Sequence, residues 1–437
     1  MKVMKFGGTS VGSPKRIADV ARLIKDAGKN FIVLSAMSGT TNTLVEICDY
    51  LYKGNFSGAG EITCALETKY RKVIEDLFSE ENKQKAEIIK SCQDVFDEIR
   101  NLIGPGFSLK EEKIILSRGE ILSTLLMSGY LRNKNIKVGY IPALDFLKTD
   151  LDGEADMKFI TASLKQEMEG LQEADLFITE GYICRNQYGE IDNLQRGGSD
   201  LTASIIGAAI GAEEIEIWTD IDGMHDNDPR FVSGTKPVET LHFEEAAELA
   251  YFGAKILHPT CVLPAKVNNI PVRLLNTLNP TAKGTLIYNF PPSRRIKAVA
   301  AKDNITAIKI KSGRMLLAYG FLRKVFEIFE TYKTPIDMIA TSEVGVSVTV
   351  DSERELSHIV DELKKFGTVT IDKDMVIICV VGDMDWKNRG FEADALDALK
   401  DIPVRMISYG GSNYNISFLV QKEDKTAALQ ALSKKLF

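Results

Sequence analysis

The first residues in this 437-residue chain that could do chemistry form the run Lys5-Phe6-Gly7-Gly8-Thr9-Ser10. Met1 to Phe6 has the pattern of a short apolar strand, and Ser13-Pro14 has that of a helix start, with an N-cap serine and a proline at the first helical position. A glycine turn between a strand and a helix N-terminus offers backbone N–H groups and a positive dipole end to an anion. Because Lys5 adds a compact positive charge, the run predicts a cradle for a phosphoryl group. It lacks the Gly-Lys-Ser/Thr ending of the usual P-loop.

Polar clusters also stand at other predicted loops and helix starts, namely Ser38–Asn42, Arg118–Glu120, Arg196–Asp200 and Thr219–Arg230. Arg196 precedes a glycine pair at a predicted helix N-terminus, a favourable place for a carboxylate or a phosphate. Asp200 cannot bind an anion, but it could orient a lysine or hold a metal through water. Glu120 could receive a substrate ammonium or simply favour the helix dipole. Spacing alone leaves a plain tight turn open for the cluster that begins at Arg196.

Strands and helices that alternate along the chain must position these clusters. The predicted strands include Phe31–Ser35, Val138–Ala143, Asp175–Thr179 and Glu214–Trp218, and the predicted helices include Pro14–Lys25, Leu201–Ala212 and a charged helical excursion over residues 61–103. This alternation indicates a layered α/β domain with buried parallel strands. Ligands of such sheets bind beyond the carboxyl ends of the strands, and the polar clusters fall there.

The style of the sequence changes after the Pro291-Pro292 linker. Pro335-Ile336-Asp337-Met338-Ile339 is echoed by Pro403-Val404-Arg405-Met406-Ile407, and each repeat has the β-α-β-β-α order of a ferredoxin-like unit. The first unit closes with a strand at Thr368–Ile371, whereas no strand follows the last helix of the second. We therefore expect Ile296–Ala301 to supply the missing strand beside residues 375–381, so that the first unit is inserted into the second.

Composition excludes several classes of protein. Hydrophobic residues make up 44% and charged residues 26%, as in ordinary soluble globular proteins, and a net charge of −7 with interspersed signs gives no nucleic-acid surface. No apolar run approaches the roughly 18 residues of a membrane span, and the glycine loop leaves no room for a signal peptide. Six scattered cysteines and four histidines without ligand spacing predict a cytoplasmic protein with no protein-held metal.

The clusters together resemble aspartokinase. The resemblance rests on Lys5–Ser10, Ser38–Asn42, Arg196–Asp200, Trp218–Asp220 with Asp228-Pro229-Arg230, and Phe252–Pro259, and on the ACT-like stretches Gly320–Leu322, Thr341–Val344 and Tyr409–Ser417. It covers nearly the whole chain in order. It implies a three-layer αβα amino-acid kinase domain over residues 1–291, a first ferredoxin-like ACT domain over 302–372, and a second ACT domain formed by 296–301 with 373–437.

The implied reaction is phosphoryl transfer from ATP to the side-chain carboxylate of L-aspartate, which gives 4-phospho-L-aspartate and begins lysine, threonine and methionine biosynthesis. The acceptor carboxylate has an ordinary pKa of about 3.9, so it needs no general base at neutral pH. The enzyme must instead align two repelling anions and neutralise their charge. Mg²⁺ is implied with ATP, carried on the phosphates with few protein ligands.

Carried over position by position, the resemblance gives each cluster a role. Lys5 would stabilise the transferring group, Asp200 would orient Lys5, and Arg196 would bind a carboxylate of aspartate, so these three are the expected catalytic residues. The expected aspartate-binding residues are Thr41, Glu120, Arg196, Gly197, Gly198 and Ser199. The expected ATP-binding residues are Lys5, Gly7, Gly8, Ser10, Thr219, Asp220, His225, Arg230, Lys255 and Ile256. His225 departs from the family, which often has Tyr or Phe there, and local sequence also allows Lys255 to be a solvated helix lysine.

The resemblance further implies an inhibitory amino-acid site in the paired ACT domains, at Met315, Gly320, Phe321, Leu322, Asp337, Ser342 and Glu343. Asp337 and Glu343 could meet an ammonium group, although solvated strand-end charges remain an alternative. The chain resembles the single-function, lysine-inhibited type, with no dehydrogenase after Phe437, and threonine inhibition stays open. We expect a homodimer or a dimer of dimers through ACT edge strands, because exposed strands pair.

Two alternatives remain on sequence grounds. A related kinase, such as glutamate 5-kinase or uridylate kinase, would share the first domain but would not need the ACT pair. A catalytically silent amino-acid sensor would share both halves but would not need Lys5, Arg196 and Asp200 together. Trapping the product with hydroxylamine while the acceptor acid is varied separates all three.

Overall fold

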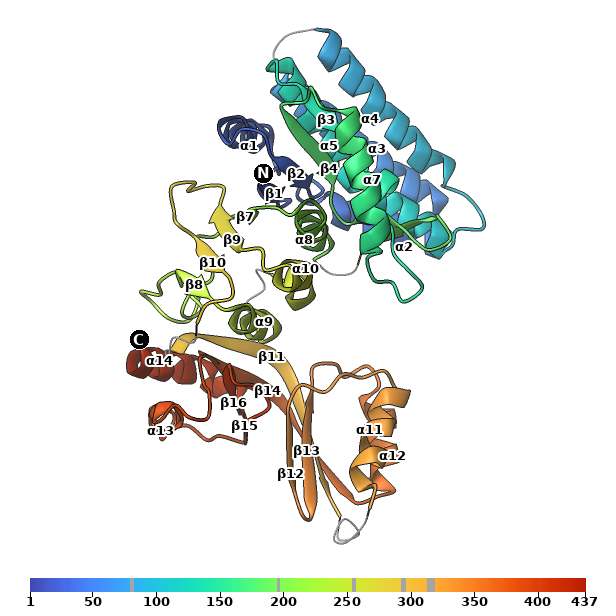
Figure 1. The fold of residues 1–437 in the computed structure, drawn as a ribbon. Coiled ribbons are helices and arrows are strands. Elements are labelled where there is room, and N and C mark those ends of the chain that lie inside the picture. Colours follow the sequence, from blue (N-terminus) through green and yellow to red (C-terminus); the bar gives the residue numbers. More distant parts are fainter. Residues whose placement is uncertain (79–81, 195–196, 254–256, 292–295, 313–318) are drawn as a thin grey trace. The chain divides into compact units, whose positions relative to one another are not determined.

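The computed structural model describes residues 1–78, 82–194, 197–253, 257–291, 296–312 and 319–437. They form two compact units, one of Met1–Gly223 with Leu257–Asn289 and the other of Met224–Ile256 with Phe290–Phe437 (Figure 1). The segment from Met224 to Ile256 therefore groups with the C-terminal part of the chain, although the sequence places it in the catalytic domain. Among the described residues, no helix has both the length and the apolar character needed to cross a membrane.

A mostly parallel sheet is the centre of the first unit. Its strands lie in the order β3 (Val138–Tyr140), β4 (Leu176–Glu180), β2 (Phe31–Leu34), β1 (Val3–Phe6), β7 (Ile215–Thr219), β9 (Val272–Asn276) and β10 (Thr285–Ile287). The strands from β3 to β9 are parallel to their neighbours, and β10 is antiparallel to β9. Every residue of β1, β2 and β4 is buried, as expected for strands covered on both faces.

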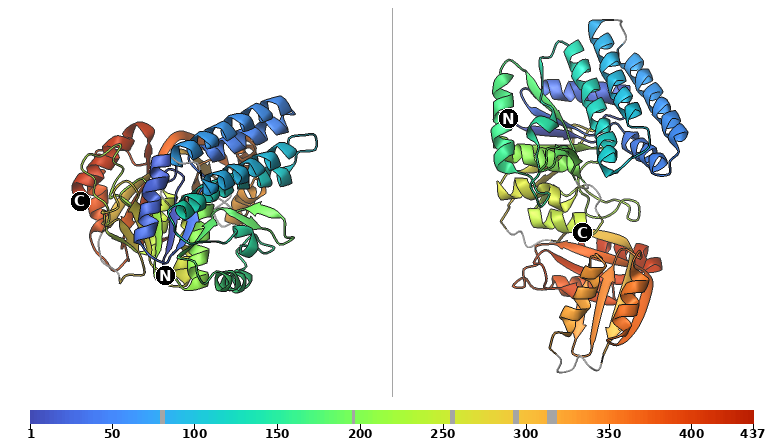
Figure 2. Two further views of the ribbon diagram at one scale, coloured as in Figure 1. Left: turned by 90° about the horizontal axis from the view of Figure 1, so that it is seen from above. Right: turned by 90° about the vertical axis from the view of Figure 1, so that its right-hand side faces the viewer.

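Helices cover both faces of this sheet. The helices of the first unit are α1 (Pro14–Asp26), α2 (Thr40–Tyr52), α3 (Phe56–Leu77), α4 (Lys83–Asn101), α5 (Leu109–Asn133), α6 (Ala143–Phe146), α7 (Met157–Gly170), α8 (Gly198–Ile210), the 3-10 turn η1 (Pro259–Val262) and α10 (Leu263–Val267). One buried cluster joins β1 and β2 to α1, α2 and α5, whereas α8 packs on the opposite face. The helices α3, α4 and α5 run side by side (Figure 2). The predicted three-layer αβα fold is confirmed.

Local sequence explains where these helices begin. Ser13 accepts a hydrogen bond from the Arg16 N–H at 3.3 Å and caps α1 as predicted. Ser108 and Glu111 form a capping box at the start of α5. The prediction that Arg118–Glu120 opens a helix was therefore wrong, because that helix starts at Leu109 and carries Glu120 in its interior.

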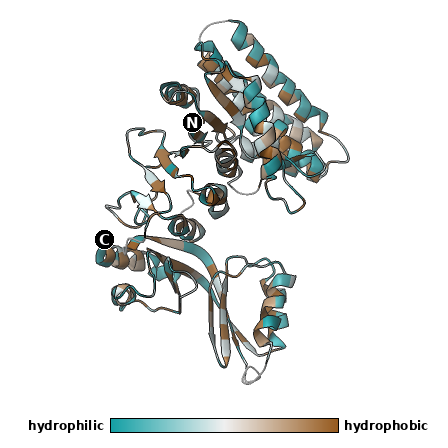
Figure 3. Cartoon of the chain, viewed as in Figure 1, coloured by the Kyte–Doolittle hydropathy of each residue, from teal (hydrophilic) through white to brown (hydrophobic). Residues whose placement is uncertain are grey.

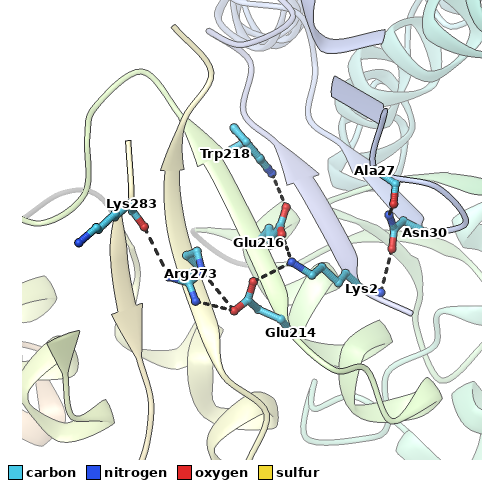
Figure 4. Close-up of polar contacts among 8 residues, drawn as sticks. All are labelled: Lys2, Ala27, Asn30, Glu214, Glu216, Trp218, Arg273 and Lys283. Carbon is cyan, nitrogen blue, oxygen red and sulfur yellow. Dashed lines mark hydrogen bonds and ion pairs between the residues drawn. The ribbon is translucent and has the colours of Figure 1, made fainter. Parts of the chain in front are cut away.

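An ion-pair network ties three parallel strands together (Figure 4). The Lys2 ammonium, just before β1, lies 3.1 Å from Glu214 and 2.6 Å from Glu216, and Arg273 of β9 lies 2.9 Å from Glu214. The Trp218 indole N–H donates to Glu216 at 2.9 Å. Figure 3 shows that hydrophobic residues dominate the strands of this unit. Charged side chains next to such an apolar sheet are stable only when they are paired, and these charges are paired with one another.

The second unit contains a six-stranded antiparallel sheet. Its order is β12 (Ile339–Ser342), β13 (Gly345–Val350), β11 (Ile296–Lys311), β14 (Thr368–Gly382), β16 (Asn415–Gln421) and β15 (Met406–Tyr409). Its helices are α9 (Phe243–Tyr251), α11 (Phe321–Thr331), α12 (Leu356–Lys364), α13 (Phe391–Ala398), η2 (Lys422–Asp424) and α14 (Lys425–Leu436), and the short strand β8 is Thr240–Leu241. The remaining strands, β5 (Ile183–Arg185) and β6 (Ile191–Asn193), form a hairpin of the first unit.

The two long strands β11 and β14 carry the expected nesting. Ile296 to Lys302 pairs antiparallel with Gly382 to Ile377, which is the pairing that the missing strand required. The later part of β11 pairs with β13 and with the first part of β14. One buried cluster gathers β13, α11 and α12, and another gathers β16, α13 and α14, so each repeat has a core of its own.

Candidate active site

The first unit contains a cavity at the carboxyl ends of its parallel strands. Its volume is about 190 Å³, and it is lined by Lys5, Ser35, Thr41, Glu120, Tyr182, Gly197, Gly198, Ser199 and Asp200. Lys5 comes from β1, Ser35 follows β2 and Tyr182 follows β4. Most of the aspartate-binding residues expected from the sequence are thus brought together, at the sheet edge where ligands of parallel sheets bind.

Lys5 and Asp200 form an ion pair in this cavity. The Lys5 Nζ and Asp200 Oδ1 atoms are 2.7 Å apart, and each side chain is about a tenth exposed. Asp200 lies in the first turn of α8, so its carboxylate reaches β1 from the helix layer that packs on the sheet. The pair holds a lysine ammonium at the cavity with its charge partly balanced, as the sequence allowed for these two residues.

The glycine turn after β1 is closely packed against neighbouring backbone. The Gly7 N–H donates to the Trp218 carbonyl at 3.1 Å. A Cβ atom on Gly8 would lie 2.6 Å from the Ala36 carbonyl oxygen, so only glycine fits there. The Ser10 hydroxyl is buried and lies 3.1 Å from the Thr277 hydroxyl. Gly7, Gly8 and Ser10 therefore shape the turn, and they do not line the cavity itself.

A second glycine turn opens α8. Gly197 is the N-cap of the helix and has a left-handed φ of 75°. Its carbonyl accepts the N–H groups of Asp200 and Leu201 at 2.9 Å each, and the Cys261 thiol donates to the same carbonyl at 3.1 Å. A Cβ atom on Gly198 would lie 2.7 Å from the ring of Tyr182. These contacts place Ser199 and Asp200 at the start of a helix that faces the cavity.

Glu120 lies in the interior of α5 and is 5% exposed. Its Oε1 atom accepts the Ala36 N–H at 3.2 Å, whereas Oε2 has no hydrogen-bond partner among the described residues. Burial raises the pKa of Glu120 to about 8; nearby Glu180 raises it too, while the Ala36 N–H and Lys5 act in the opposite direction. Glu120 therefore brings to the wall of the cavity a buried carboxyl oxygen that can still take part in a hydrogen bond.

The sequence analysis missed Ser35 and Tyr182. Tyr182 has a left-handed φ of 70°, unusual for a residue with a side chain, and its N–H donates to the Thr202 hydroxyl at 3.1 Å. Burial, then the charge of Glu120, raises the pKa of Tyr182 to about 12, so the phenol is neutral at neutral pH. Its place directly after β4, at the carboxyl end of a parallel strand, is the signal that could have found it.

Thr41 and Thr219 stand at the ends of other elements of the same unit. Thr41 is the second residue of α2, whose N-cap Gly39 has a φ of 82°. Thr219 ends β7, and its carbonyl accepts the Thr277 N–H at 2.8 Å. The Thr219 hydroxyl donates to Asp220 at 3.3 Å. Both loops follow the carboxyl ends of strands, where the sequence predicts them.

His225 and Arg230 belong to the second unit. The His225 Nδ1 atom lies 3.0 Å from the Thr235 hydroxyl. The Arg230 guanidinium binds the Asp228 carboxylate through contacts of 2.6 to 3.1 Å and is 77% exposed. The predicted site residues Arg196, Lys255, Ile256 and Met315 lie outside the described residues.

The described effector residues expected from the sequence lie in the second unit, most of them near the start of α11 or the end of β12. Gly320 is the N-cap of α11 with a φ of 79°, Leu322 is 37% exposed, and Phe321 is buried. Ser342 and Glu343 are exposed beside β12. Asp337, in contrast, has a side chain only 1% exposed, because the Lys302 ammonium lies 2.6 Å away and the Tyr251 hydroxyl donates to it at 2.9 Å. A lysine of the chain itself already meets this carboxylate.

No three side chains of His, Cys, Asp or Glu gather closely enough to hold a metal ion within the parts of the chain that the structure describes.

Comparison with known proteins places these residues in a family. The amino acid kinase family model matches residues 1–276, and an ACT domain model matches residues 378–436. Aspartokinase 1, chloroplastic, of Arabidopsis thaliana is 35% identical over 100% of this chain and 80% of its own length. Lysine-sensitive aspartokinase 3 of Escherichia coli K12 is 33% identical over 100% of this chain and 99% of its own length.

The fold agrees with the same family. The crystal structure of E. coli aspartokinase III in complex with aspartate and ADP has a TM-score of 0.86 and 31% identity, with both chains covered completely. The structure of that enzyme with lysine and aspartate has a TM-score of 0.83, 31% identity and coverage of 100% and 99%. The resemblance expected from the motifs is confirmed: the chain belongs to the aspartokinase family and is an aspartate kinase.

Proposed function

We propose that this aspartate kinase transfers the γ-phosphoryl group of Mg²⁺-bound ATP to the side-chain carboxylate of L-aspartate in the cavity at Lys5, under inhibition by lysine. The observation that carries the catalytic part is the 2.7 Å Lys5–Asp200 ion pair beside the unpartnered oxygen of Glu120. Phosphoryl transfer to an amino acid requires a cation that stabilises the developing negative charge and a carboxyl group that binds the ammonium of the amino acid. Lys5 and Glu120 supply these two groups.

A carboxylate oxygen of aspartate attacks the γ-phosphorus, and the bond from that phosphorus to the bridging oxygen of ADP breaks. No proton has to move, because the nucleophile is already ionised. Lys5 stabilises the negative charge on the transferring group, and Asp200 keeps the lysine in place. The products are ADP and 4-phospho-L-aspartate, the starting compound for lysine, threonine and methionine synthesis.

Aspartate is held by its charged groups. Glu120 binds the ammonium group, and Arg196 binds a carboxylate. Thr41, Gly197, Gly198 and Ser199 supply hydroxyl and backbone groups around the acceptor. The small volume of the cavity, about 190 Å³, supports an acceptor with a short side chain.

The nucleotide is bound by residues after β1 and β7 and in the segments that follow. Its phosphates lie toward Lys5, Gly7, Gly8 and Ser10, and the remaining contacts come from Thr219, Asp220, His225, Arg230, Lys255 and Ile256. Glycine at position 8 lets the turn after β1 pack against the Ala36 carbonyl, and this fixes the shape of the turn between β1 and α1. Mg²⁺ would supply charge neutralisation on the phosphates, and it is expected to keep several of its water ligands.

We infer that lysine is the inhibitor. The E. coli relative is named as lysine-sensitive, and the crystal structure of E. coli aspartokinase III with lysine and aspartate is similar to the structure of this chain. Glu343, Ser342, Gly320, Phe321, Leu322, Met315 and Asp337 form its site. Threonine, alone or with lysine, is the second candidate. An inhibition panel of lysine, threonine and methionine, singly and in pairs, tests this assignment.

We further propose ACT domains at 302–372 and at 296–301 with 373–437, in a homodimer or dimer of dimers through their edge strands. The exposed apolar residues Ile339 on β12 and Ile407 on β15 support pairing at these edges. Six free cysteines support a cytoplasmic location.

The test of the catalytic proposal is hydroxamate formation with aspartate, glutamate and no acceptor. We expect an ATP-dependent hydroxamate with aspartate alone. A hydroxamate with glutamate would indicate a different acid kinase, and none with any acceptor would leave only an amino-acid sensor.

A further inference from the structure

The segment that carries Arg230 is fastened to α14, the last helix of the chain. We propose that Lys425 of α14 and Asn227 are positioning residues for ATP binding, because they hold this segment in place. The inference rests on the proposed contact of Arg230 with the nucleotide. It gives the C-terminal helix a role in positioning Arg230, in addition to any part in regulation.

Lys425 is the centre of the attachment. Its side chain is 9% exposed, and its ammonium lies 4.2 Å from the centre of the Phe231 ring, the residue next to Arg230. The same ammonium contacts both oxygens of Asp303 at 2.7 and 2.8 Å. A buried cation over an aromatic face is a strong contact, since water does not compete for it.

Backbone and apolar contacts extend the attachment on both sides of Phe231. The buried Asn227 side chain donates to the Leu429 carbonyl of α14 at 3.1 Å. Gln430, also of α14, donates to the Phe231 carbonyl at 3.1 Å. Val232 is 8% exposed and packs in the cluster that contains Leu429. The segment is therefore held by one helix at three residues, Asn227, Phe231 and Val232.

Arg230 lies at the outer edge of this attachment, with its guanidinium carbon 5.8 Å from the centre of the Phe231 ring. Its guanidinium is 77% exposed and is oriented by the Asp228 carboxylate, with the shortest contact at 2.6 Å. The backbone is thus fixed by buried contacts, while the cationic group is presented to solvent in one orientation. Such an arrangement lowers the conformational entropy that is lost when Arg230 binds an anion. If the attachment is removed, the affinity for ATP should therefore weaken, while aspartate binding stays unchanged.

The test is steady-state kinetics of the full chain with Lys425→Met. We expect the KM for ATP to rise by about five- to tenfold, with kcat and the KM for aspartate within about twofold. Lys425→Arg keeps a cation over Phe231 and should restore most of the affinity. The matched control is Lys435→Met, because Lys435 lies on the same helix and pairs with Asp397 at 3.0 Å without touching the segment. It should leave all three constants unchanged.

The inference is overturned if Lys425→Met raises the KM for ATP no more than Lys435→Met does, or if both substrates are affected equally. If thermal unfolding shows that Lys425→Met does not fold, Gln430→Ala takes its place, since Gln430 is exposed, with an expected rise of about threefold. Arg230→Ala separates this inference from the proposed site. An unchanged KM for ATP in Arg230→Ala removes the proposed contact and the inference with it, whereas a raised KM there with a silent Lys425→Met removes the inference alone.

Discussion

Each unit of this chain contains a buried lysine–aspartate pair, and the two pairs differ in what surrounds them. In the first unit Lys5 and Asp200 are 2.7 Å apart and line a cavity. In the second unit Lys302 and Asp337 are 2.6 Å apart, but Lys302 also lies 2.9 Å from Asp351 and 4.6 Å from the ring centre of Tyr251.

The two lysines therefore differ in whether they can bind a further anion. Lys5 has a single carboxylate partner among the described residues and an open cavity beside it, so it can meet a further anion. Lys302 meets two carboxylates and an aromatic face, which leaves it a role in holding β11 to the residues around β12. The same pair of residue types lines a cavity in the first unit, whereas in the second unit Lys302, Asp337 and Tyr251 form an internal cluster that we call the clamp.

The largest effect should come from Lys5→Met. Without the ammonium, the charge on the transferring phosphoryl group has no fixed partner, and we expect kcat to fall by about 10³-fold or more while the protein stays folded. Hydroxamate formation measures the fall in kcat, and thermal unfolding shows whether the variant is folded. A fall of less than tenfold would mean that the cavity pair has no larger role in catalysis than the clamp.

Lys302→Met should act on stability rather than on chemistry. It leaves Asp337 buried with the Tyr251 hydroxyl as its remaining partner, so we expect a loss of about 3 kcal/mol in the stability of the second unit. If Asp337 belongs to the lysine site, free lysine should restore part of the lost thermal stability by supplying an ammonium. Methionine, which has no side-chain cation, is the control additive. Equal effects of both amino acids would contradict the assignment of Asp337.

The pKa of Glu120 is raised to about 8, and this gives a pH-dependent test of the cavity in the first unit. Below that pH the carboxyl is protonated and cannot pair with the substrate ammonium without losing its proton. We therefore expect the KM for aspartate to fall as pH rises from 6 to 8, by at most about tenfold per unit, and to level off above 8. In Glu120→Gln this dependence should be absent and the KM uniformly high. A flat wild-type profile would contradict the assignment.

The sequence could predict the cavity pair because each member has a local signal. Lys5 ends a strand before a glycine turn, and Asp200 follows a glycine pair at a helix start. Glu120 was identified as a residue but placed wrongly, since the capping box at Ser108 starts the helix earlier than the cluster suggested. Tyr182 was missed because side-chain residues rarely adopt its left-handed φ of 70°.

The clamp was beyond local reasoning. Asp337 was expected to face an effector or solvent, yet its partners Lys302 and Tyr251 lie 35 and 86 residues away in the chain. The Asp337 N–H donates to the Thr349 carbonyl of β13, and β13 pairs with β11, so the fold of the first ferredoxin-like repeat brings Lys302 to Asp337. The nesting itself was predictable, because the repeat left one strand unaccounted for, and the pairing of Ile296–Lys302 with β14 is observed.

The smallest effect should come from Tyr251→Phe, which removes one hydroxyl from the clamp. Tyr251 ends α9, directly before the stretch that begins at Phe252 and that we expect to reach the nucleotide, while its hydroxyl binds Asp337 at 2.9 Å. Loss of one hydrogen bond to a buried carboxylate should raise the half-inhibitory lysine concentration by about threefold, because the effector residue is then less firmly connected to α9. Tyr409→Phe is the control, since its hydroxyl donates to the Met384 carbonyl at 3.3 Å, away from Asp337. If both variants keep the lysine response of the wild type, the clamp only holds β11 in place, and inhibition must reach the active site by another connection.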